Sequence, residues 1–131
     1  MDKKILFITD MDFKGSGYLQ ISIPLCMGLA HKGYSIKVIG MNYENNEHTF
    51  PFSILSCKNF QDAHAMIINL NILDKPDVVI VALDIPHHGF FIDKVKALGL
   101  KYIVITPLEN PPLTISWAAP LLNADEVFFI S

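Results

Sequence analysis

The sequence has little of what marks secreted, membrane-spanning or metal-binding proteins. Its two cysteines, Cys26 and Cys57, do not have the spacing of a zinc site, so we expect buried, reduced thiols and no disulfide framework. No apolar run approaches the roughly 18 residues that span a bilayer. We expect no secretory signal at the N-terminus, because its apolar stretch is short and runs into Asp10. These absences predict a soluble, cytoplasmic protein.

Positive charge is also scarce. Lysine and arginine together number 10 against 13 aspartates and glutamates, for a formal net charge of -3, and the basic residues are scattered. A protein that binds nucleic acid, or an acidic membrane directly, needs a basic surface to attract the phosphates. We therefore predict that nucleic acid is not a partner.

The sequence is rich in apolar residues. Of its 131 residues 51% are hydrophobic and 18% are charged, which suits one domain with a substantial core. Apolar runs of strand length alternate with helical patterns along the chain. Residues 78–83 are continuously apolar, as expected of a parallel strand buried under helices on both faces. The sequence predicts an α/β fold, a Rossmann-like, three-layer, doubly wound sheet of about six parallel strands.

Helix-ending residues support these boundaries. Gly33 and Gly99 each follow a helical pattern and are expected in the left-handed conformation that ends a helix. Pro120 interrupts the last pattern, which predicts a short or kinked helix. The expected strands cover residues 4–9, 35–40, 51–56, 77–83, 101–106 and 126–130, and the expected helices cover residues 18–32, 60–73, 90–98 and a shorter segment within 116–123.

The first strand ends at Asp10 and leads into Gly15-Ser16-Gly17 just before a helix. Such a junction is where α/β proteins hold anionic or sugar-like ligands. Gln20 replaces the third glycine of the dinucleotide motif, and Asn42 stands where an acidic residue would follow the second strand, so a dinucleotide is disfavoured. A Walker lysine is missing too. Either the loop allows close approach of another ligand or it is purely structural.

Two other strand ends carry polar side chains. His87 and His88 follow Asp84, and because adjacent loop side chains diverge, we expect one imidazole to hydrogen-bond a ligand rather than the pair to hold a metal. Glu109 lies in the proline-rich segment 106–112, which suits recognition of several hydroxyl groups. Simpler alternatives stay open: a solvated loop or helix cap for the histidines, and a merely stiff connection for the prolines.

The carboxylate pair Asp10 and Asp12 supports a different hypothesis. Its position after the first strand is similar to that in the haloacid dehalogenase-like phosphatases, which implies Asp10 as nucleophile, Asp12 as acid/base and a magnesium ion. The lysine and the further metal-binding carboxylates of that family are not evident. A phosphatase-like fragment and a non-catalytic Rossmann-like ligand-binding module stay as alternatives.

Four segments together resemble the N-terminal domain of GT-B glycosyltransferases of the group 1 or family 4 kind. Residues 4–10 with Gly15-Ser16-Gly17 are similar to that family's first strand and glycine loop. Residues 25–38 are similar to its following helix-to-strand passage. Residues 76–80 resemble its Pro-Asp strand, and residues 116–131 resemble the end of its first domain. The resemblance spans nearly the whole chain.

The resemblance implies a hexosyl transfer from a nucleotide-sugar donor to a sugar, lipid or protein acceptor. In such enzymes the donor lies mainly in a second Rossmann-like domain, and the acceptor binds the first domain across a cleft. The nucleotide sugar is a substrate, no cofactor or bound metal is implied, and no catalytic residue is assigned. The implied substrate-binding residues are Gly15, Ser16, Gly17 and Tyr18 near the donor phosphate or transferred sugar, Asp84, His87 and His88 on the acceptor side, and Glu109.

The same resemblance predicts the domain organisation. Residues 1–131 are expected to form a single Rossmann-like domain, the N-terminal, acceptor-side half of a longer two-domain enzyme. The partner of this half is a missing C-terminal Rossmann-like domain, so the chain alone should be close to inactive. Peripheral membrane association through the full-length enzyme stays open.

Overall fold

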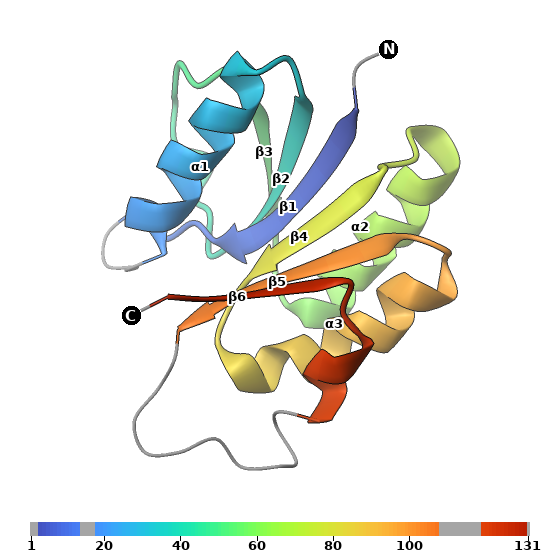
Figure 1. The fold of residues 1–131 in the computed structure, drawn as a ribbon. Coiled ribbons are helices and arrows are strands. Elements are labelled where there is room, and N and C mark those ends of the chain that lie inside the picture. Colours follow the sequence, from blue (N-terminus) through green and yellow to red (C-terminus); the bar gives the residue numbers. More distant parts are fainter. Residues whose placement is uncertain (1–2, 14–17, 108–118, 131) are drawn as a thin grey trace.

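A computed structural model describes residues 3–13, 18–107 and 119–130. These residues form one six-stranded sheet in the order β3-β2-β1-β4-β5-β6, and every neighbouring pair of strands is parallel (Figure 1). The strands are β1 (Lys4–Asp10), β2 (Ser35–Met41), β3 (Ser53–Cys57), β4 (Val78–Ala82), β5 (Lys101–Pro107) and β6 (Glu126–Ile130). The helices are α1 (Leu19–His31), α2 (Phe60–Leu73) and α3 (Ile85–Ala97), with a 3-10 helix η1 (Ala119–Asn123).

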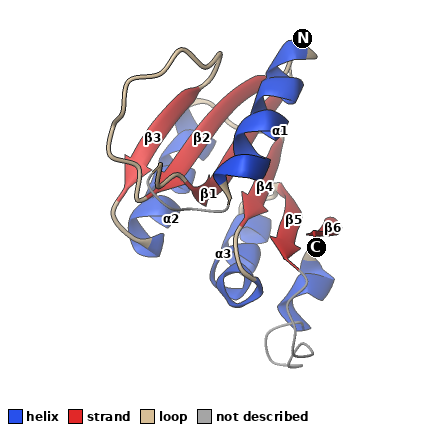
Figure 2. Ribbon diagram, turned by 90° about the vertical axis from the view of Figure 1, so that its left-hand side faces the viewer, coloured by secondary structure: helices blue, strands red, loops and turns tan. Residues whose placement is uncertain are grey.

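Helices cover both faces of the sheet. Figure 2 shows α1 on one face and α2 with α3 on the other. Phe7 and Val38 pack with Cys26 of α1, whereas Leu6 and Ile8 pack with residues of α2 and α3, because neighbouring strand residues point to opposite faces. Burial on both sides explains why the strands are continuously apolar. The structure confirms the predicted doubly wound parallel sheet. Among the described residues, no helix is long and apolar enough to cross a membrane.

The predicted helix ends are confirmed at two glycines. Gly33 has φ 97° and Gly99 has φ 77°, each just past the end of a helix. At Gly33 the amide N–H groups of Gly33 and Tyr34 donate to the carbonyls of Ala30 and Leu29, the hydrogen-bond pattern of a Schellman motif. All six strands lie within two residues of their predicted limits.

The predicted start of α3 is wrong by five residues. We expected a loop up to Gly89 and a helix from residue 90, but the helix begins at Ile85. Pro86 lies in the first turn, where its missing N–H costs no hydrogen bond, so it favours a helix start here rather than a loop. Near the C-terminus η1 is short, as Pro120 predicts, while residues 116–118 of the expected segment lie outside the described residues.

Both cysteines are buried and free, as expected. Burial raises the pKa of Cys26 to about 12. Burial, with a smaller contribution from the negative charge of Asp62, raises the pKa of Cys57 to about 11. Because only the thiolate reacts readily, these side chains act as small apolar groups in the core.

Candidate functional site

A pocket of about 150 Å³ lies at the carboxyl ends of β1, β2 and β4. The strand order reverses here, because the chain runs from β1 outward to β3 and then crosses back to β4 on the other side of β1. Such a switch point is where open α/β sheets bind ligands. The described residues that line it are Asp10, Tyr18, Met41, Asn42, Phe60, Leu83, Asp84 and His87.

Tyr18 and Asp84 form a polar contact at the pocket. The Tyr18 phenol donates a hydrogen bond of 2.5 Å to Asp84 Oδ1 across 66 positions of sequence. Both residues are N-caps, Tyr18 of α1 and Asp84 of α3. The structure therefore brings together two predicted site residues that the sequence places far apart.

The Asp84 carboxylate does not cap its own helix. Aspartate at an N-cap usually accepts a hydrogen bond from the second or third helical N–H, but Asp84 makes no such bond. The second helical residue is Pro86, which has no N–H, and the N–H of His87 donates to the Asp84 backbone carbonyl instead. The carboxylate is thereby available to Tyr18 and to the pocket.

Asp10 is positioned by the way the chain turns after β1. Its Oδ1 accepts a 3.0 Å hydrogen bond from the N–H of Asp12. Between them the N–H of Met11 donates to the Met41 carbonyl at 2.8 Å, which continues the pairing of β1 with β2 past the strand end. Met11 is fully buried over Gly40, where an added Cβ would lie 2.9 Å from the Met11 side chain. The small size of Gly40 thus determines the path of the segment that carries Asp10.

Asn42 and Phe60 line the pocket although we did not predict them as binding residues. Asn42 directly follows β2 and lies in the left-handed region, with φ 60°, a conformation that asparagine tolerates better than most residues. Phe60 begins α2, and its ring meets the His87 imidazole edge-on at 4.9 Å between centroids. The strand-end rule points to Asn42, but no local signal brings Phe60 here, because its place depends on how α2 packs against α3.

The side chains of His87 and His88 lie in different environments. His87 lines the pocket, as expected, whereas His88 lies in the core with none of its surface exposed. His88 Nε2 donates to the Leu83 carbonyl at 3.0 Å, so its Nδ1 accepts from the Tyr102 hydroxyl at 2.9 Å. Burial lowers the pKa of His88 to about 4. The expectation that His88 faces a ligand is corrected: on a helix, adjacent residues point about 100° apart.

The remaining predicted site residues are Gly15, Ser16, Gly17 and Glu109, and all four lie outside the described residues. The described parts of the chain contain no group of three or more His, Cys, Asp or Glu side chains arranged to hold a metal ion.

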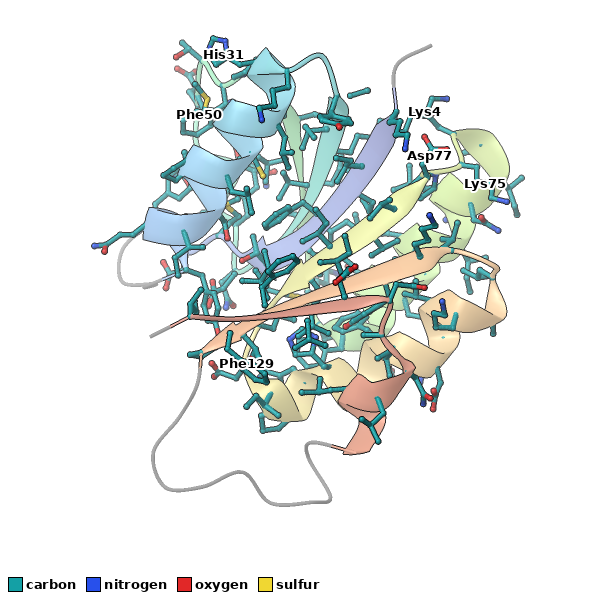
Figure 3. All side chains as sticks on the ribbon, in the orientation of Figure 1. Lys4, His31, Phe50, Lys75, Asp77 and Phe129 are labelled. Carbon is teal, nitrogen blue, oxygen red and sulfur yellow. The ribbon has the colours of Figure 1, made fainter. Side chains whose placement is uncertain are left out.

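Basic side chains gather at the opposite edge of the sheet. The amines of Lys4 and Lys37 each lie 2.5 Å from an oxygen of Asp74, at the amino ends of β1 and β2. Hydrogen bonds from Lys37 and then Lys4 lower the pKa of Asp74 to about 2. Figure 3 shows Lys4 and Lys75 near Asp77 at this edge, away from the pocket. These ion pairs hold the charges of Lys4 and Lys37 at the amino edge of the sheet, away from its carboxyl edge.

No family model and no curated protein matches this sequence. Solved structures do match. An alpha-glucosyltransferase in complex with UDP and a 13-mer DNA containing a HMU base has a TM-score of 0.62 at 11% identity, over 98% of this chain and 38% of its own. LpCGTa in complex with UDP has a TM-score of 0.56 at 11% identity, over 81% of this chain and 30% of its own.

A third match is the WlbA (WbpB) dehydrogenase from Thermus thermophilus in complex with NAD and UDP-GlcNAcA. Its TM-score is 0.59 at 12% identity, over 98% of this chain and 41% of its own. This chain thus spans between 30% and 41% of the length of these three structures. At such low identities the likeness shows the fold. It confirms the predicted fold class, a Rossmann-like, doubly wound parallel sheet.

Proposed function

We propose that this chain is the N-terminal, acceptor-side half of a GT-B glycosyltransferase, of the group 1 or family 4 type. The observation that carries the proposal is the pocket at the switch point between β1 and β4. Its carboxylates, amide and phenol can exchange hydrogen bonds with several hydroxyl groups, and Phe60 with Leu83 supplies an apolar wall. A sugar-like acceptor has both kinds of surface.

In the proposed reaction an acceptor hydroxyl attacks the anomeric carbon of a nucleotide sugar. A glycosidic bond forms, the bond from the anomeric carbon to the nucleotide phosphate breaks, and the nucleotide leaves with the electron pair while the hydroxyl loses its proton. The pocket residues would bind and orient the acceptor. Holding two reactants close together in the reactive orientation can supply much of the rate enhancement. The donor would lie mainly on a second Rossmann-like domain.

The test is a transfer assay on the full-length polypeptide that the proposal requires. The reading frame should continue past Ser131 into a second Rossmann-like pattern. The full-length polypeptide should release nucleotide from a nucleotide sugar only when an acceptor is present. Asp84→Asn should lower kcat/KM at least tenfold, about 1.4 kcal/mol of transition-state stabilisation. Asp93→Asn, at an exposed position on α3, is the matched control and should leave it unchanged. A stop codon directly after Ser131 contradicts the proposal.

Two alternatives give different results in simple assays. A phosphatase related to the haloacid dehalogenases would hydrolyse a generic phosphoester with magnesium, and Asp10→Asn would abolish that hydrolysis. A non-catalytic binding module would be complete at about this length and would bind ligand without turnover. The transferase proposal expects neither outcome.

A further inference from the structure

We infer that the pocket takes a hydroxyl-rich group that is uncharged or carries an amine, and that it rejects a negatively charged one. The inference rests on the proposed function, since it specifies which acceptors the same pocket accepts. It starts from the charges around the cavity. Of the eight described residues that line the pocket, two are aspartates, Asp10 and Asp84, and none is a lysine.

Four of the described lysines have partners away from the pocket. Lys4 and Lys37 bind Asp74 at the amino edge of the sheet. Lys96 binds Asp125 at 2.8 Å, and the amine of Lys94 lies 4.2 Å from the centre of the Phe90 ring. No lysine among the residues that the structure describes therefore offsets the two carboxylates from within the pocket wall.

The N-terminus of α3 would ordinarily favour an anion in this position. Free N–H groups and the positive end of the helix dipole attract phosphate and carboxylate. Here Pro86 removes one of the N–H groups, and the N-cap residue is itself an aspartate, Asp84. A ligand anion at this helix end would lie beside the Asp84 carboxylate and meet it as a like charge.

The hydrogen-bonding capacity that remains on the two carboxylates suits donors on the ligand. Carboxylates only accept hydrogen bonds, and Asp84 uses Oδ1 for Tyr18, while its Oδ2 receives none from the described part of the chain. Asp10 likewise uses Oδ1 for the Asp12 N–H. Ligand hydroxyls and ammonium groups can donate to the remaining lone pairs, whereas a phosphate or carboxylate offers only acceptors.

The inference can be tested on this chain with three probes of equal size: methyl glucoside, methyl glucosaminide and methyl glucuronide. Titrations followed by two-dimensional ¹⁵N NMR should shift the amides of Asn42, Asp84 and His87. The neutral and aminated glycosides should bind at least about tenfold more tightly than the glucuronide, because one ion-pair or like-charge contact at intermediate dielectric changes affinity by that order.

Two variants locate the source of the preference. Asp84→Asn and Asp10→Asn should each reduce the ratio of the glucuronide Kd to the glucosaminide Kd, the affinity gap, by about threefold or more. Asp93→Asn should not change this ratio. Dispersed amide spectra check that each variant is folded. If the glucuronide binds as tightly as the others, or if neither variant changes the gap, the inference is wrong while the proposed function stands. If no glycoside shifts the pocket amides, both are overturned.

Discussion

The Tyr18 hydroxyl and the Asp84 carboxylate join the N-caps of two helices on opposite faces of the sheet. Their 2.5 Å hydrogen bond crosses the carboxyl ends of β1 and β4 at the switch point of the fold. Tyr18 is the N-cap of α1 on one face, and Asp84 is the N-cap of α3 on the other. Since both residues also line the pocket, this contact connects the stability of the fold with the shape of the candidate site.

Removing the Tyr18 hydroxyl should therefore lower the stability of the fold. Tyr18→Phe leaves the ring but takes the donor from a partly buried carboxylate, and the free energy of unfolding should fall by about 1.5 kcal/mol, as for hydrogen bonds to charged groups. Urea unfolding measures the change. Tyr34→Phe, just before β2 and distant from the pocket, is the control and should cost less. Combining Tyr18→Phe with Asp84→Asn should cost less than the sum of the two. Strict additivity would show that the contact contributes nothing.

The buried imidazole of His88 should make the protein sensitive to acid. Burial is the main reason that the folded-state pKa is about 4, against about 6.5 in an unfolded chain. Between these values the unfolded chain binds a proton that the folded chain excludes. The free energy of unfolding should therefore be unaffected by His88 above about pH 6.5 and should fall by about 3 kcal/mol as the pH is lowered to 4.

The measurement for His88 is urea unfolding between pH 7 and pH 4, in the parent chain and in His88→Gln. The variant is less stable at pH 7, because the amide cannot reproduce both ring hydrogen bonds, but its stability should decline less steeply with acid. His31→Gln, at an exposed position in the last turn of α1, should keep the steep decline. Equal slopes in the parent chain and His88→Gln would show that this imidazole does not titrate as described.

Replacing either of two glycines by alanine should change the free energy of unfolding, in opposite directions at the two positions. At Gly40 a Cβ would lie 2.9 Å from the Cβ and Cγ of Met11 and 3.1 Å from a methyl of Ile54, so Gly40→Ala should lower the free energy of unfolding by about 1–3 kcal/mol. At Gly28, inside α1, a Cβ would meet no atom within 4 Å. Gly28→Ala should raise stability by about 0.5–1 kcal/mol, because alanine is the better helix former. Thermal or urea unfolding of both variants measures these changes. A stabilised Gly40→Ala variant or a destabilised Gly28→Ala variant would contradict the prediction.

Much of the fold could be predicted because its signals are local. Apolar runs predicted all six strands, and Gly33 and Gly99 predicted two helix ends. The start of α3 was missed because Pro86 was treated as a loop residue, although proline is favoured in a first helical turn. Placing the helix five residues earlier is what sends His88 into the core and leaves His87 at the pocket.

The candidate site was only partly predictable. The rule that ligands bind at the carboxyl ends of parallel strands pointed to Tyr18, Asp84 and His87, and the structure places these three at one pocket. Phe60 could not be predicted, since nothing in its neighbourhood in sequence distinguishes it from a core residue.

The sequence by itself determined the class of fold, because continuous apolar strands alternating with helices have few stable arrangements other than a parallel sheet covered on both faces. Only the tertiary structure decided which polar groups meet. Tyr18 and Asp84 are 66 positions apart, and the Asp84 carboxylate turns from its own helix to Tyr18 because of contacts that form when α1 and α3 pack on the sheet. Pairing of distant side chains depends on packing geometry, which no local pattern of residues encodes.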